Sequence, residues 1–118
     1  MSTTVQETPS EHLERLGIYL EFSFNKKWCY KHQFPGQEVI IVSDEDKDKA
    51  ASKFFVEYLK SLHYSLRYLY EDGRIEALNK TIEKYSAFKD QNIDKTIQIF
   101  TRGMRPADLQ RLHKRVNN

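Results

Sequence analysis

The stretch from Ser43 to Asp72 constrains the fold more than any other part of the chain, because no other run keeps one periodicity for so long. Apolar side chains recur along it at helical spacing, namely Ala51, Phe55, Tyr58, Leu62, Leu66 and Leu69. Ser43 can cap the first turn, where the acidic residues that follow complement the helix dipole. We therefore expect one amphipathic helix, roughly 40 Å long at about 1.5 Å per residue, that ends at Gly73.

The length of 118 residues suits one domain that buries its own hydrophobic core without a metal or a disulfide. Residues 1–9 are polar and rich in Thr, Gln and Glu, which predicts a disordered lead ahead of a single domain at residues 10–118. Ser10 is placed to cap a short helix that runs through Leu16.

Three segments ahead of the long helix are predicted to be strands. Ile18 to Phe24 alternates with the strand period of two, although a helix would align some of the same apolar residues, and aromatic enrichment favours the strand. Trp28–Phe34 and Val39–Val42 follow, separated by Pro35 and Gly36, which suit the central positions of a type II turn. We expect an antiparallel three-stranded meander that leads into the long helix.

Beyond Gly73, a second helical pattern predicts a helix antiparallel to the first, carried by Ile75, Leu78, Ile82 and Tyr85. Residues 95–101 fit either a strand or a helix, and their β-branched composition favours a fourth strand. Pro106 suits the first turn of a final helix. The expected fold is α+β: a small antiparallel sheet of three or four strands, packed by a long helix hairpin, with a short basic C-terminal helix.

The sequence carries no recognisable reaction chemistry. Glycine-rich phosphate loops and nucleophile-elbow motifs are absent, and the four histidines are far apart. Cys29 is the only cysteine, and on a strand it would point to the face opposite His32. We expect no catalysis, no metal and no cofactor. Without a run of about 20 apolar residues or a secretory signal, we also expect no membrane span and a cytoplasmic location.

Positive charge is concentrated at the C-terminus. Residues 95–118 carry six basic side chains and one acidic side chain, whereas residues 1–94 carry 13 basic and 16 acidic ones. Five of these basic residues lie after segment 95–101 and continue into the predicted final helix: Arg102, Arg105, Arg111, Lys114 and Arg115. They can contact a nucleic-acid backbone or an acidic protein, or they can merely complement a helix dipole and keep the chain soluble.

The polar side of the long helix offers a second candidate site. Tyr64 and Tyr68 lie one turn apart there, next to Lys60 and Arg67. Tyrosine and arginine are enriched at interface hot spots, but packing of another segment over the rings would make them ordinary core. We expect a small non-catalytic regulator, adaptor or assembly factor that binds another protein through these four residues and can self-associate. The alternative is a nucleic-acid-binding accessory protein that uses the basic C-terminus.

Overall fold

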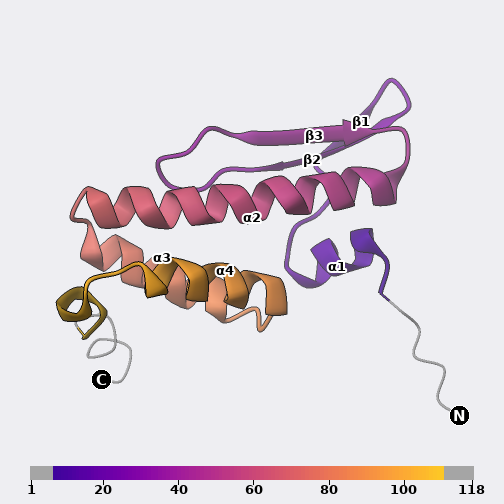
Figure 1. Cartoon of the computed structure of the whole chain (residues 1–118). Helices are drawn as coiled ribbons and strands as arrows, with labels where there is room; N and C mark the ends of the chain where they lie inside the picture. The colour runs from indigo at the N-terminus through magenta and orange to yellow at the C-terminus, as the bar shows by residue number, and fades with distance from the viewer. Residues whose placement is uncertain (1–6, 111–118) are drawn as a thin grey trace, which may run out of the picture. The chain divides into compact units, whose positions relative to one another are not determined.

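The computed structural model describes residues 7–110, which adopt a mixed α+β fold with an antiparallel sheet, as the sequence predicts at that level (Figure 1). These residues divide into two compact units. The first comprises the chain up to Gln33 together with Glu38–Tyr58, and the second comprises Phe34–Gln37 together with the chain from Leu59. The long helix therefore contributes to both units. The expectation of one domain at residues 10–118 stays a prediction.

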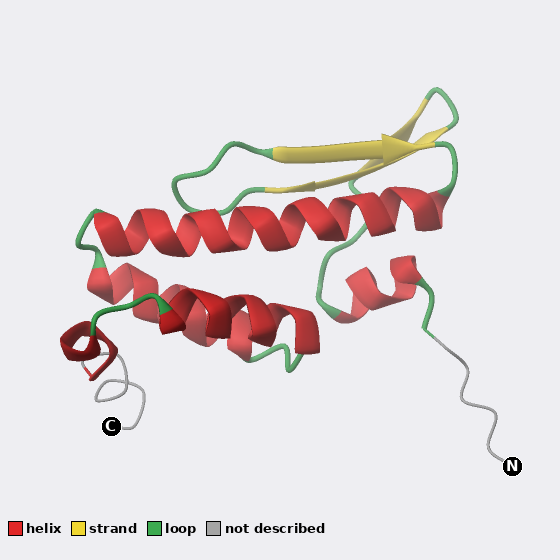
Figure 2. Ribbon diagram, in the orientation of Figure 1, coloured by secondary structure: helices red, strands yellow, loops and turns green. Residues whose placement is uncertain are grey.

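The first unit contains a short helix, a sheet and the beginning of the long helix. In chain order the elements are α1 (Pro9–Arg15), β1 (Phe22–Phe24), β2 (Lys27–His32), β3 (Ile40–Asp44) and α2 (Lys47–Glu71). The strands pair antiparallel in the order β1-β2-β3, and β1 adds only three residue pairs to the longer β2–β3 pairing (Figure 2). Each strand pairs with its neighbour in sequence, so short connections suffice.

The first helix begins earlier than the sequence predicts. Thr8 is its N-cap and accepts a hydrogen bond from the Glu11 amide at 3.2 Å, while the Glu11 carboxylate accepts from the Thr8 amide at the same distance. This reciprocal capping box displaces Ser10, the expected cap, into the first turn. The predicted strand from Ile18 is also too long, because only Phe22–Phe24 pairs with β2.

The start of α2 is a second correction. Ser43 belongs to β3 and pairs with Cys29, so it does not cap the helix. Asp46 takes that role, because its Oδ1 atom accepts from the amides of Asp48 and Lys49 at 2.9 and 3.0 Å. An aspartate carboxylate accepts such bonds as well as a serine hydroxyl does. The run of acidic residues expected in the first turn of the helix thus begins at Asp44, the last residue of β3.

The core of the first unit is built from aromatic rings between the sheet and α2. Tyr30 of β2 lies 5.7 Å from the Phe54 ring, centroid to centroid, and His32 lies 5.1 Å from Tyr58. Alternation along β2 points Cys29 to the other face, so Cys29 and His32 lie on opposite faces as predicted. One face of the sheet is therefore covered by α2 (Figure 2).

The second unit is helical. The end of α2, α3 (Ile75–Ser86) and α4 (Gln91–Arg102) run back and forth through short connections (Figure 1). Gly73 has φ +74° in the first connection, a left-handed conformation that glycine adopts without strain. The predicted second helix is confirmed, with Leu78 and Tyr85 buried in this unit's core.

Residues 95–101 are helical, so the preferred strand is wrong. Asp90 caps α4 and its Oδ1 atom accepts from the amides of Asn92 and Ile93, each at 3.0 Å. The buried residues of α4 recur at helical spacing, namely Ile93, Ile97 and Phe100. This amphipathic face outweighs the strand preference of the β-branched residues, and no fourth strand forms among residues 7–110.

Residues 106–110 are helical where the described chain ends. The basic residues expected on that helix, Arg111, Lys114 and Arg115, lie outside the described residues. The basic C-terminal helix therefore stays a prediction. Within residues 7–110, every helix is too short or too polar to cross a membrane.

Candidate functional site

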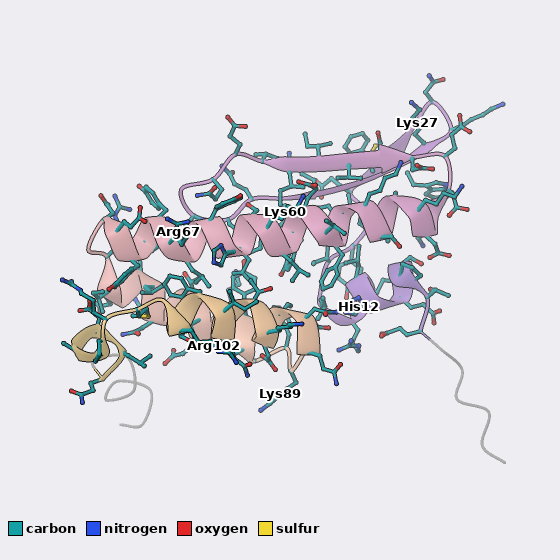
Figure 3. All side chains as sticks on the ribbon, viewed as in Figure 1. His12, Lys27, Lys60, Arg67, Lys89 and Arg102 are labelled. Carbon is teal, nitrogen blue, oxygen red and sulfur yellow. The ribbon has the colours of Figure 1, made fainter. Side chains whose placement is uncertain are left out.

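The four residues predicted to bind a partner lie on the part of α2 that belongs to the second unit. Lys60 and Arg67 are exposed, and Figure 3 labels both along α2. The Tyr64 side chain is 56% exposed and that of Tyr68 is 37% exposed, so neither ring is core. The two tyrosines nevertheless have different surroundings. Tyr64 lines a groove, whereas Tyr68 packs against a turn.

Tyr68 packs against the turn at Pro35 and Gly36. The Gln37 amide donates to the Phe34 carbonyl at 3.1 Å, and Gly36 has φ +74°, which confirms the predicted turn with glycine in its third position. A Cβ atom built on Gly36 would overlap the Tyr68 ring. The Arg74 guanidinium lies 5.8 Å from the centre of the same ring. Tyr68 thus holds this turn and has a structural role.

Tyr64 lines a surface groove between α2 and α4. The groove has a volume of about 290 Å³, and its walls are Leu59, Lys60, His63, Tyr64, Thr96 and Ile99. His63 contacts the edges of two rings, with centroids 6.1 Å from Tyr64 and 6.5 Å from Phe100. Ile99 of α4 is 52% exposed. Two large apolar side chains from different helices are therefore accessible in one hollow.

Exposed basic side chains lie on both helices that form the groove. Lys60 lines it on α2, and Arg67, farther along α2, pairs with Glu71 at 3.2 Å. On α4, Lys95 and Arg102 are exposed and flank Ile99 at helical spacing. Figure 3 labels Arg102 on that helix. A ligand that enters the groove with carboxylates beside its apolar side chains would meet complementary charge.

The described part of the predicted basic segment is only partly available for binding. Arg105 Nε donates to Asp108 Oδ2 at 3.0 Å, and the Tyr70 hydroxyl donates to the same oxygen at 2.8 Å. Hydrogen bonding with Tyr70, and then with Asp108, raises the pKa of Arg105. Arg105 therefore neutralises a buried carboxylate, while Arg102 faces solvent. Nucleic-acid binding through the whole basic segment stays a prediction.

A second hollow, about 400 Å³ in volume, lies in the first unit between α1 and α2. Its two charged walls neutralise each other, because Arg15 Nε donates to Glu7 Oε1 at 2.8 Å. None of the predicted site residues lies there. Among residues 7–110, no group of three or more His, Cys, Asp or Glu side chains is arranged to hold a metal ion.

Sequence reasoning identified one wall of the groove and missed the other. It selected Lys60 and Tyr64, but Thr96 and Ile99 were assigned to a strand. A usable signal was present, because the helical spacing of Ile93, Ile97 and Phe100 leaves Ile99 off the buried face. No family model, curated protein or solved structure matches the chain.

Proposed function

We propose that the protein is a non-catalytic regulator, adaptor or assembly factor that binds an amphipathic helix of another protein in the groove between α2 and α4. The observation that carries the proposal is the pair of large apolar side chains, Tyr64 and Ile99, which are more than half exposed on opposite walls. Helix-in-groove recognition places apolar side chains of the ligand helix in such a hollow. Tyrosine also supplies contact area with little loss of conformational entropy.

The surrounding charge supports a ligand with acidic residues beside its apolar face. Lys60 lines the groove on α2. Arg67 is exposed farther along α2, and Lys95 and Arg102 are exposed one turn to either side of Ile99 on α4. Rim charges mainly steer association and select partners, whereas the buried apolar contacts supply most of the affinity. A groove of this volume accommodates few side chains, so we expect an affinity in the micromolar range, near −8 kcal/mol.

The test is a selection of displayed helical peptides on the immobilised protein. We expect enriched peptides to carry apolar residues at positions i, i+3 or i+4, and i+7, with Asp or Glu on the flanks. Ile99→Asp should abolish their binding, because it places a carboxylate in the apolar hollow. Val56→Asp is the matched control, since Val56 is also 52% exposed on α2 and lies outside the groove.

Tyr64→Ala should weaken the same peptides while changing the free energy of unfolding by no more than about 0.5 kcal/mol, as is usual at exposed sites. Peptides without the acidic and apolar pattern, or peptides that bind Ile99→Asp as tightly as the native protein, would contradict the proposal. Binding that is lost equally in Val56→Asp would move the interface to another part of α2.

A further inference from the structure

The sheet of the first unit has a second face, opposite the one that α2 covers. Strand register places Phe22, Cys29 and Ser43 in one row across β1, β2 and β3 on that face. Lys27 and Lys31 lie two residues before and after Cys29, so they share its face, and Ile41 pairs with Lys31. We call these six positions the outer sheet face.

The outer sheet face is accessible. Phe22 is 46% exposed, and the side chains of Lys27, Lys31, Ile41 and Ser43 are exposed as well. By contrast, Tyr30 on the inner face is fully buried against Phe54. Phe22 and Ile41 are thus large apolar side chains in contact with solvent on a face that also carries lysines.

The residues across the sheet from Phe22 are small. Cys29, directly opposite Phe22, is small and buried, and Ser43 lies beyond it. These two positions therefore carry no bulky side chain. Lys27 and Lys31 occupy the two diagonal positions, about 7–8 Å away, where long side chains still reach the same ligand.

Both charged residues among the six positions of the outer sheet face are lysines. Lys27 and Lys31 belong to it, and Lys26 is exposed in the turn that joins β1 to β2, where it has φ +62°. Figure 3 labels Lys27 at this end of the sheet. None of the six positions of the outer sheet face is acidic. A ligand for this face therefore combines a flat apolar group with negative charge nearby.

We infer that the outer sheet face binds single-stranded nucleic acid. An exposed aromatic ring on an uncovered sheet stacks a nucleobase, and neighbouring lysines contact the phosphates on either side of it. A base in a duplex is already stacked on its neighbours and is not available to the ring. Phe22 offers no hydrogen bond to a base edge, so binding tolerates any sequence.

The inference predicts weak binding with a shallow salt dependence. Each phosphate neutralised on a single strand contributes about −0.7 to the slope of log K against log salt, so three lysines give a slope of about −2. We would measure this by fluorescence anisotropy with the full-length protein and a short fluorescein-labelled oligothymidylate. A labelled duplex of the same length should bind more weakly at every salt concentration.

Two sets of variants separate stacking from charge. Phe22→Leu removes the ring and keeps an apolar side chain above Cys29, and it should weaken the oligothymidylate about tenfold, while Phe22→Trp should bind at least as tightly as the native protein. The pair Lys27→Gln and Lys31→Gln should reduce the slope to about −0.7. Lys49→Gln, on the exposed side of α2, is the matched charge control and should leave the slope near −2.

Several outcomes would overturn the inference. Unchanged binding by Phe22→Leu, or weaker binding by Phe22→Trp, would show that the ring does not stack. Equal binding of a labelled polyglutamate peptide would make the face a site for acidic proteins. If Arg102→Gln alone abolished binding, the nucleic-acid contact would be assigned to the C-terminal basic segment instead. Tyr64→Ala should leave oligothymidylate binding unchanged, so failure of this inference and failure of the proposed groove remain distinguishable.

Discussion

The two halves of α2 are buried in different ways. In the first unit, α2 contributes Phe54 and Tyr58, whose rings meet rings from β2. In the second unit it contributes a row of leucines at helical spacing, Leu62, Leu66 and Leu69, which are buried in a helical core. One continuous hydrophobic pattern therefore supports two kinds of packing. The pattern identifies the buried face of a helix but does not reveal whether a sheet or another helix covers it.

Core truncations in each half should test this difference with the largest effects. We expect Phe54→Ala and Leu66→Ala to lower the free energy of unfolding by about 3–5 and about 2–5 kcal/mol, respectively, through lost burial and a residual cavity. Hydrogen exchange should show the larger loss of amide protection in β2 and β3 for Phe54→Ala, and in α4 for Leu66→Ala. Equal losses throughout the chain would show that the two units open together and would remove the distinction.

Alkaline pH should weaken the second unit through Tyr85. Burial raises the pKa of Tyr85 to about 12 from its ordinary value of 10.0. The unfolded chain therefore loses this proton first, so the stabilisation is complete below about pH 10 and is lost as pH rises towards 12. Two pKa units correspond to at most about 3 kcal/mol. Denaturant unfolding across this window should show the decline, and Tyr85→Phe should reduce it.

Tyr30 gives the corresponding comparison in the first unit. Burial, and then the charges of Glu14 and Asp48, raise the pKa of its hydroxyl. That hydroxyl has no hydrogen-bond partner among residues 7–110. Tyr30→Phe should therefore leave stability at neutral pH unchanged or higher, because it removes a buried polar group that makes no bond. A decline above pH 10 that persists unchanged in Tyr85→Phe would assign the alkaline sensitivity to other groups, such as Tyr30.

Two glycines of the second unit, Gly36 and Gly73, allow a matched comparison within one unit. Gly36→Ala should cost about 2 kcal/mol, because it combines positive φ with overlap of the Tyr68 ring. Gly73→Ala is the control, since it has the same φ of +74° but no atom within 4 Å of the added Cβ, and strain alone should cost about 1 kcal/mol. In a Tyr68→Ala background, Gly36→Ala should fall to the same value. Equal costs at both glycines in the native background would remove the structural role assigned to Tyr68.

The sequence predicted the elements better than their boundaries. The long helix and the helix after Gly73 have helical periodicity over several turns, which is the most dependable signal. The starts of α1 and α2 were misplaced because Thr8 and Asp46 can cap as well as Ser10 and Ser43, and only the surrounding contacts decide among them. Segment 95–101 was misassigned because local composition competed with an amphipathic face.

The candidate sites were predictable only where one element carries them. Lys60 and Tyr64 share one face of a single helix, so spacing sufficed to group them. The groove also needs Ile99, which lies far along the chain, and the outer sheet face needs the register of three strands. Long-range packing of this kind leaves no periodic trace in a single sequence. Tyr68 lies one turn from Tyr64, as the spacing predicts, and it also contacts the turn at Gly36. Its part in partner binding stays a prediction.

Cys29 makes the first unit observable without an engineered probe. It is the only thiol in the chain, and it is shielded in the middle strand of the sheet. Cys29 is 6% exposed, so a disulfide reagent reaches its sulfur only when the side chains around it move aside. The labelling rate under native conditions therefore measures how often that local opening occurs. Because the second unit contains no cysteine, the same labelling rate does not report motions confined to that unit. Labelling of Cys29 therefore reports on local opening in the first unit alone.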